Sequence, residues 1–229
     1  NNTLNCYILK ADIKKYFENV EHEILLSAIR KKIADKKVDW LIKKIFTNSF
    51  SQGKGMPLGN LTSQFFANVY LNDFDWFVKT KLKAKYYIRY VDDFVIFEVD
   101  KPKLEFYKGQ IDDFLKSKLK LQLHKDKSKI FKLGDSINFL GFRVFYCYKL
   151  LKKSNIGKMK QKLNSLAQKY KLREVDYDSV YDFLEGWIAY AKNANAYKLR
   201  KKITAEFEKD FANEISTKEI SRYFKMKKK

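Results

Sequence analysis

The sequence predicts an α+β fold, in which an antiparallel sheet with packed helices is followed by an all-helical domain. Two observations lead to this class. Short apolar runs of strand length are mixed with amphipathic helical patterns up to residue 155, and only helical patterns follow from residue 156. We therefore expect two domains, residues 1–155 and 156–229, and 229 residues are enough for two modest cores.

The first expected strand runs from Cys6 to Ile13. Strand alternation places Leu9 and Ala11 on one face and Asp12 on the other, near the strand end. An aspartate at this position either performs chemistry or caps the helix that follows. The strand alone leaves both interpretations open.

Helical periodicity follows in three segments, with a glycine-rich loop from Gly53 to Gly59 before the third. Their expected ranges are 20–34, 38–50 and 61–81.

A hairpin is expected from Tyr86 to Phe97, because two apolar, aromatic-rich runs flank a very short break. Asp92 and Asp93 occupy that break. Paired carboxylates at a bend suit a hard cation such as Mg²⁺, which prefers oxygen ligands. The alternative is that Asp-Asp is simply favourable turn chemistry.

The remaining elements complete the α+β order. A helix is expected over 104–119 and helices over 156–170, 177–192 and 197–224. Short strands are expected over 121–133 and 137–148, with turns at Lys125-Asp126 and Gly134-Asp135.

Charge and composition point to a polyanionic partner. The net charge is +21, from 48 Lys and Arg against 27 Asp and Glu, and nucleic acid is the first candidate. An anionic membrane surface is less favoured, because the lysines are spread along the whole chain. Two cysteines provide no disulfide framework or zinc spacing, and no apolar run reaches 18 residues. We expect a cytoplasmic protein that has no membrane partner.

Four motifs stand in a characteristic order: Ala11–Phe17 (ADIKKYF), Gly55–Leu71 (GMPLGNLTSQFFANVYL), Tyr90–Asp93 (YVDD) and Phe139–Phe142 (FLGF). Together they resemble the palm of a reverse transcriptase. The resemblance implies a polymerase palm with the lower part of the fingers in residues 1–155. It implies a helical thumb with a basic tail in residues 156–229.

The implied activity is RNA-directed DNA polymerisation by two-metal nucleotidyl transfer. The resemblance makes Asp12, Asp92 and Asp93 catalytic. These carboxylates and the backbone carbonyl of Ile13 would ligate two Mg²⁺ ions, with Mn²⁺ as the alternative metal. The implied partners are an RNA template, a DNA primer or cDNA, and dNTPs.

The resemblance assigns further residues to substrates. Those expected at the nucleotide are Phe17, Leu58, Gly59 and Lys127, and those expected at template or primer are Ser63, Gln64, Tyr90, Phe139, Leu140 and Gly141. Phe17 would exclude a 2′-hydroxyl, and Lys127 would lie near the pyrophosphate. Simpler roles compete: core packing for Phe17, helix capping for Ser63 and Gln64, and a solvated surface for Lys127, with Lys129 as the other candidate lysine.

The subclass is suggested by Leu58-Gly59 and Ser63-Gln64, where group II intron and retron enzymes usually carry Gln-Gly and Ser-Pro. In this respect the chain looks like the reverse transcriptases of diversity-generating retroelements, which copy adenines with errors and work with a small basic accessory protein. We hypothesise that Leu58 weakens discrimination, because it replaces an amide that could hydrogen-bond near the nucleotide.

Other interpretations stay open. They are a phage-defence, group II intron-like or other bacterial reverse transcriptase, and a non-catalytic RNA-binding palm–thumb protein. The chain also begins almost directly on a strand, so we expect that the upstream part of the fingers is missing, and whether this chain alone is active stays open.

Overall fold

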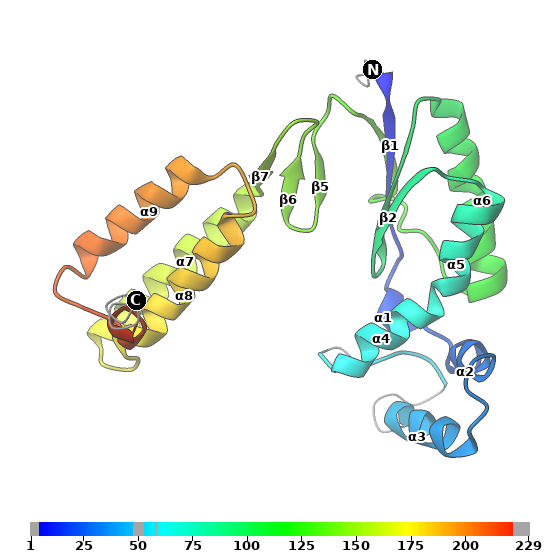
Figure 1. Ribbon diagram of the computed structural model, residues 1–229, viewed down its shortest axis with the longest axis horizontal. Helices are drawn as coiled ribbons and strands as arrows, with labels where there is room; N and C mark the ends of the chain where they lie inside the picture. Colours follow the sequence, from blue (N-terminus) through cyan, green and yellow to red (C-terminus); the bar gives the residue numbers. More distant parts are fainter. Residues whose placement is uncertain (1–4, 48–52, 58, 222–229) are drawn as a thin grey trace, which may run out of the picture. The chain divides into compact units, whose positions relative to one another are not determined.

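The computed structural model describes residues 5–47, 53–57 and 59–221 (Figure 1). The chain divides into two compact units, Asn1–Asp135 (unit 1) and Ser136–Lys229 (unit 2). The domain boundary expected after residue 155 stays a prediction. The strands between Ser136 and residue 155 pack with the helices of unit 2, because Leu151 is buried in the core that those helices form.

Unit 1 is built on a four-stranded antiparallel sheet with the strand order β2-β3-β1-β4. Its strands are β1 (Tyr7–Asp12), β2 (Tyr86–Tyr90), β3 (Asp93–Glu98) and β4 (Lys129–Lys132). The alternation expected for the first strand is confirmed, since Leu9, Ala11 and Ile13 are buried in the core.

Helices cover one face of this sheet, and α5 and α6 lie on the same side of it (Figure 1). The helices of unit 1 are α1 (Tyr16–Asn19), α2 (His22–Arg30), α3 (Lys36–Thr47), α4 (Leu61–Tyr70), α5 (Asn72–Trp76), the π-helix η2 (Phe77–Lys81) and α6 (Lys101–Leu119). The single helix expected over 61–81 is wrong. Leu71 leaves helical geometry (φ −89°, ψ 5°), and the last turn widens to a π-helix.

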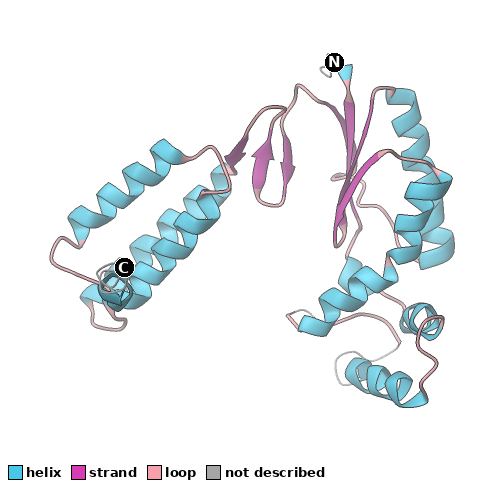
Figure 2. Cartoon of the chain, in the orientation of Figure 1, coloured by secondary structure: helices cyan, strands magenta, loops and turns pink. Residues whose placement is uncertain are grey.

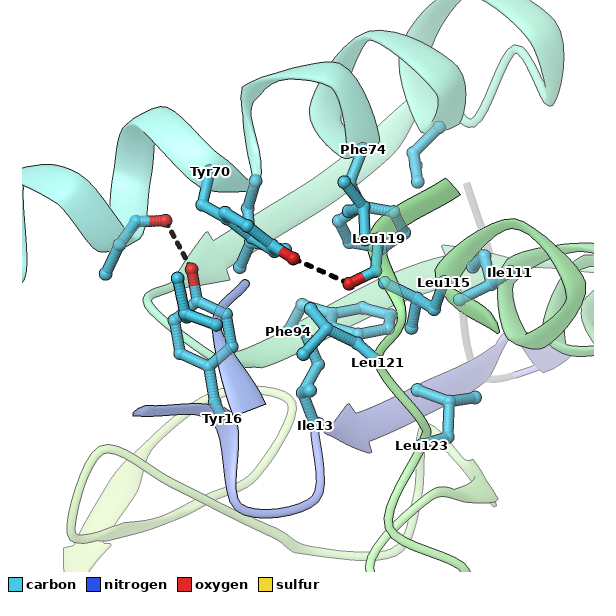
Figure 3. Packing of buried hydrophobic residues seen from close by; sticks show 14 of the residues in the cluster. Ile13, Tyr16, Tyr70, Phe74, Phe94, Ile111, Leu115, Leu119, Leu121 and Leu123 are labelled. Carbon is cyan, nitrogen blue, oxygen red and sulfur yellow. Dashed lines mark hydrogen bonds between the residues drawn. The ribbon is translucent and has the colours of Figure 1, made fainter. Parts of the chain in front are cut away.

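Two buried tyrosines connect the helices of unit 1 through the core (Figure 3). The Tyr70 hydroxyl donates to the Leu119 carbonyl at 2.7 Å, which satisfies an acceptor at the end of α6. The Tyr16 hydroxyl donates to the Ala67 carbonyl at 2.6 Å and so ties α1 to α4. Burial raises the pKa of Tyr70 to about 12, so this hydroxyl stays a donor at neutral pH.

Unit 2 combines a three-stranded meander with a helical bundle (Figure 2). The strands are β5 (Ile137–Phe139), β6 (Phe142–Val144) and β7 (Lys149–Leu151), and the helices are α7 (Lys153–Lys171), α8 (Tyr177–Ala191) and α9 (Tyr197–Asp210). Helices α7 and α8 pack side by side.

The strands and the last helix differ from expectation. The turn expected at Lys125-Asp126 is present and β4 follows it, but strand structure before the turn is limited to an isolated bridge between Ile13 and Leu123. The helix expected over 197–224 ends at Asp210, and helical structure resumes at Thr217. There the Ser216 hydroxyl accepts from the Glu219 amide, and the Glu219 carboxylate accepts from the Ser216 amide. This is a capping box.

Two expectations from composition can be compared with the described residues. Cys6 and Cys147 are both unpaired thiols. No helix in the described ranges is long and apolar enough to cross a lipid bilayer.

The buried Tyr70 hydroxyl provides a test of the unit 1 core. Tyr70→Phe should lower the free energy of unfolding by about 2 kcal/mol, because the buried Leu119 carbonyl loses its donor. Urea unfolding measures the change. The control Tyr86→Phe, on an exposed side chain, should stay within about 0.5 kcal/mol of the wild type. Equal effects in the two variants would contradict the assignment.

Candidate active site

Three aspartates meet at one corner of the sheet of unit 1. Asp12 is the last residue of β1 and lies directly opposite Asp93, the first residue of β3. Asp92 belongs to the two-residue turn that joins β2 to β3. The Ile13 amide donates to the Asp92 carbonyl at 3.2 Å, which fixes the turn against the end of β1. The expected hairpin is therefore present, and it brings together residues that are far apart in the sequence.

The turn has a strained backbone that a partly buried ion pair supports. Val91 has a φ of 56°, which is unfavourable for a β-branched residue and is usually reserved for glycine at this turn position. Arg89 donates to the Val91 carbonyl at 2.9 Å. The same guanidinium binds both carboxylate oxygens of Asp75, at 2.7 and 2.5 Å. Asp75 belongs to α5, so this pair anchors the hairpin to the helical layer.

Two lysines neutralise part of the carboxylate charge. Lys10 Nζ lies 2.7 Å from Asp93 Oδ1, and both side chains are mostly buried. Lys127 Nζ lies 3.3 and 3.4 Å from the two carboxylate oxygens of Asp12. Lys127 thus lies at the aspartates, and its role toward pyrophosphate stays a prediction. Lys10 was missed, although strand alternation places it on the same face as Asp12.

Burial and mutual repulsion shift the titration of two aspartates. Burial raises the pKa of Asp92, and the charges of Asp12 and Asp93 raise it further. Burial also raises the pKa of Asp93, against the opposing effect of the hydrogen bond and charge from Lys10. Unlike Asp93, Asp92 receives no hydrogen bond from a cationic side chain. A bound cation would therefore stabilise the ionised form of Asp92.

The backbone of Asp12 is held by His124 and Ser128, two residues of the loop before β4 that the sequence did not indicate as functional. The His124 amide donates to the Asp12 carbonyl at 2.8 Å. Ser128, which is almost fully buried, accepts from the Asp12 amide at 3.3 Å and donates to the Asp12 carbonyl at 3.4 Å. Asp12 does not cap the next helix, because α1 begins after Lys15 and has no side-chain cap.

The donor chemistry fits a hard divalent cation, although the present side-chain arrangement is not a complete cage. Among the described residues, no group of three His, Cys, Asp or Glu side chains is placed to hold a metal ion. The Asp93 carboxylate is already paired with the Lys10 ammonium group. Asp12 and Asp92 remain as two oxygen donors whose repulsion a divalent cation would relieve, and Mg²⁺ commonly takes one or two carboxylates plus substrate phosphates.

The other residues expected at the nucleotide or template lie on α1, α4 and the loop before α4. Phe17 is half-buried and packs edge-to-face on Tyr16, so the competing core role is visible. Gly59 has a φ of 85° and open space around its α-carbon, and Leu58 lies outside the described residues. Gln64 is exposed.

Helix α4 is capped by a residue that we did not expect. The Asn60 side chain accepts from the Thr62 amide, so Ser63 and Gln64 are not the cap. Ser63 is buried, and its hydroxyl lacks a partner among the described residues. Its burial weighs against the predicted template contact, which Gln64 is better placed to make.

The residues expected at the primer fall in both units. Tyr90 is exposed and lies opposite Asp93 in the sheet of unit 1. Phe139, Leu140 and Gly141 form the β5–β6 hairpin of unit 2, with positive φ at Leu140 (49°) and Gly141 (83°). Two positive φ values in a two-residue loop indicate a type I′ turn. Leu140 is exposed at its tip.

This hairpin is anchored to the helices of unit 2. The Gly141 carbonyl accepts from the Tyr190 hydroxyl at 2.9 Å and from Asn155 Nδ2 at 3.3 Å. The Phe142 ring packs on Tyr190 with the centroids 5.0 Å apart. A β-carbon at Gly141 would lie 2.8 Å from the Tyr190 hydroxyl, so only glycine fits here.

Comparison with known proteins gives a family match over most of the chain. The family described as "Reverse transcriptase (RNA-dependent DNA polymerase)" matches residues 1–144. Protein YkfC of Escherichia coli (strain K12) is 28% identical over 193 residues, 67% of this chain and 49% of that protein. The group II intron-encoded protein LtrA of Lactococcus lactis subsp. cremoris is 33% identical over 87 residues, 35% of this chain and 14% of LtrA. The chain thus spans about half the length of the first relative and a smaller part of the second.

The solved structures that the chain matches include two of telomerase from Candida tropicalis. Apo telomerase from Candida tropicalis has a TM-score of 0.49 and 16% identity, over 61% of this chain and 31% of that chain. Telomerase from the same organism with a TWJ fragment of telomeric RNA has a TM-score of 0.46 and 13% identity, over 89% of this chain and 40% of that chain.

The raised pKa of Asp92 predicts that replacing this carboxylate by a neutral side chain increases thermal stability in a pH-dependent way. In the unfolded chain, the Asp92 carboxyl loses its proton around the ordinary pKa of about 3.9, whereas in the folded state it loses it only at a higher pH. Ionising Asp92 therefore costs more in the folded state, and the ionised carboxylate destabilises the fold at neutral pH. In metal-free buffer, Asp92→Asn should melt at a higher temperature than the wild type at pH 7. The gain should disappear below about pH 3.9.

Thermal melts across this pH range measure the effect. Asp135→Asn, at an exposed turn of the same unit, is the matched control and should show no such pH-dependent gain. A gain of equal size at pH 3 and pH 7, or none at either, would be inconsistent with a raised Asp92 pKa.

Two glycine-to-alanine substitutions in unit 2 should have opposite signs. Gly141→Ala should cost about 1–3 kcal/mol, because it forces a strained positive φ and collides with Tyr190. Gly186→Ala lies in an exposed turn of α8 with nothing within 4 Å, and it should stabilise by up to about 1 kcal/mol. Guanidinium unfolding measures both. Stabilisation by Gly141→Ala would show that the hairpin is not held as described.

Proposed function

The chain belongs to the reverse transcriptase family, and from this premise we propose that it forms the catalytic part of an RNA-directed DNA polymerase. Its substrates are an RNA template, a DNA primer end and dNTPs. The single observation that carries the proposal is the meeting of Asp12, Asp92 and Asp93 at the joined ends of β1 and β3. The net charge of +21 supports a polyanionic substrate.

Asp12 and Asp92 would hold the divalent cations, with the backbone carbonyl of Ile13 beside them. Bound Mg²⁺ supplies charge neutralisation for the attacking 3′-oxygen and for the leaving pyrophosphate. Asp93 keeps its ion pair with Lys10, and this pair adds a side-chain contact between β3 and β1. Strained Val91, supported by Arg89, presents the Asp92 carboxylate at the end of the turn.

Lys127 and the aromatic residues act on the substrates. Lys127 is more than half exposed and is held by a long, weak contact to Asp12, so it can exchange that contact for a triphosphate oxygen. The exposed part of Phe17 would lie under the incoming sugar and exclude a 2′-hydroxyl. Tyr90 and the Leu140 tip would contact primer and template through their exposed apolar surfaces.

We propose the subclass from sequence motifs. Leu58-Gly59 and Ser63-Gln64 favour the error-prone enzyme of a diversity-generating retroelement, which would act with a small basic accessory protein. The similarity to the group II intron-encoded protein LtrA favours the second candidate, an intron-like reverse transcriptase. The two unpaired cysteines support a reducing, cytoplasmic location for either enzyme.

Primer extension on an RNA template tests the activity. The natural full-length protein should extend a DNA primer only with dNTPs and Mg²⁺, and EDTA should abolish extension. Asp92→Ala should lower the rate at least about 1000-fold, since several kcal/mol of charge stabilisation depend on the metal site. The control Asp135→Ala removes a carboxylate in an exposed turn and should retain the wild-type rate. Extension by Asp92→Ala at the wild-type rate would refute the site.

Sequencing of the cDNA tests the subclass separately. Errors concentrated opposite template adenines are expected for the retroelement enzyme, and an even, low error rate is expected for the intron-like alternative. Leu58→Gln should reduce adenine errors roughly tenfold, because it restores a hydrogen-bonding side chain at the nucleotide. An unchanged error spectrum in this variant would remove Leu58 from the explanation.

A further inference from the structure

A cavity of about 750 Å³ lies at one end of unit 2, where β6 and β7 meet the beginning of α7 and the α8–α9 loop. We call it the α9 pocket. Its cationic lining residues are Arg143, Lys153, Lys198 and Arg200, and its apolar floor includes Leu151 and Ile156. All of these residues belong to unit 2, so the pocket is complete within one compact unit.

The charge of the α9 pocket is uncompensated. Its lining contains no Asp or Glu. Among the described residues none of its four cations forms an ion pair, and the residues outside the description include no Asp or Glu. Four cations that line one pocket without a counter-charge repel one another, and a bound anion relieves that repulsion.

Charge is also segregated along the sequence of unit 2. Residues 136–173 contain ten Lys and Arg and no Asp or Glu, and residues 186–205 contain no acidic residue either. The carboxylates of unit 2 lie within 174–185 and 206–219. These two segments include the beginning of α8 and the last part of α9, away from the pocket. A surface built only for solvation would mix both signs.

The pocket has a fixed framework. Asn195 ties the α8–α9 loop to β7, because its amide donates to the Lys149 carbonyl at 2.8 Å and its side chain accepts from the Lys149 amide at 3.2 Å. Helix α9 begins at the pocket without a side-chain cap, so its first N–H groups are available to an anion. Arg200 Nε is buried and lacks a partner among the described residues.

The pocket also has an aromatic rim. Tyr197 is exposed, and the Arg200 guanidinium lies over its ring at 5.9 Å from the centroid. An exposed aromatic ring next to a cationic groove is the combination that binds a base or sugar beside its phosphate.

We propose that the α9 pocket binds a backbone phosphate of a nucleic-acid strand, with the adjoining nucleoside against Tyr197. This inference rests on the proposed function, because that function supplies the strand. A free nucleotide shares the phosphate chemistry and is the other source to be tested. The pocket adds a contact in unit 2 that is separate from the aspartate site of unit 1.

Salt-dependent binding of a fluorescein-labelled oligoribonucleotide, followed by anisotropy, tests the proposal. Each phosphate contact to a single strand contributes about 0.7 to the slope of log K against log salt concentration. Because the proposed contact is to one backbone phosphate, the double variant Lys153→Ala/Lys198→Ala should reduce that slope by up to about 0.7 and weaken binding about tenfold. Arg200→Gln should act in the same direction, and thermal melts verify folding of each variant.

The matched control is Lys171→Ala/Lys209→Ala, which removes the same charge from the same two helices at exposed positions outside the pocket. A smaller effect of the control on slope and affinity supports the pocket. Equal effects of the two double variants would overturn it, because binding would then follow net charge alone.

Titration with AMP identifies the source of the phosphate. If the pocket variants lose AMP binding and keep the wild-type RNA slope, the strand assignment is overturned in favour of a free nucleotide. Asp92→Ala separates this inference from the proposed function, since it should abolish primer extension and leave the RNA slope unchanged. If no variant or wild type extends a primer, the proposed function fails, and the slope comparison still decides the pocket.

Discussion

The antiparallel register between β1 and β3 is the constraint on which the candidate site depends. It places Asp12 opposite Asp93 and brings the turn that carries Asp92 beside the end of β1. A slip of one residue would turn Asp12 toward the helical layer and expose the core face of the strand. Leu9, Ala11, Phe94 and Ile96 are fully buried on that face, so a large hydrophobic penalty opposes the slip. The geometry of the carboxylates is thus determined by apolar residues that take no part in chemistry.

The aspartate site lowers the stability of the fold locally, and neighbouring ion pairs limit that destabilisation. Half-buried carboxylates repel one another, and Val91 has a backbone conformation that suits glycine. Lys10 compensates Asp93, while the Arg89–Asp75 pair fastens the strained turn to α5. Such conflicts are expected where a fold prepares charge for a ligand, because a site relaxed without its ligand would bind it less strongly.

Sequence reasoning identified what depends on local pattern and missed what depends on packing. The hairpin and its aspartates were predictable, because apolar runs and a short polar break specify them. The Lys10–Asp93 and Arg89–Asp75 ion pairs were not, because pairing between separate segments has no local signature, even though strand alternation gave the face on which Lys10 lies. The break at Leu71 was not predictable either, because helical periodicity continues across it in the sequence. The end of α9 was a different kind of miss, since Ser216 and Glu219 have capping-box spacing that was available in the sequence.

The organisation of unit 2 suggests why its hairpin and its basic pocket occur together. Asn155 on α7 and Tyr190 on α8 anchor the Gly141 turn, and Asn195, just beyond α8, anchors the pocket loop to β7. Both features therefore depend on the same end of the helical bundle. The segments that form this end lie within residues 136–173 and 186–205, which contain no Asp or Glu. A nucleic-acid strand bound there would meet the apolar Leu140 tip and the cations on one rigid support. Because the hydrogen bonds that hold these two features are made within unit 2, the packing of that unit alone determines the spacing between them.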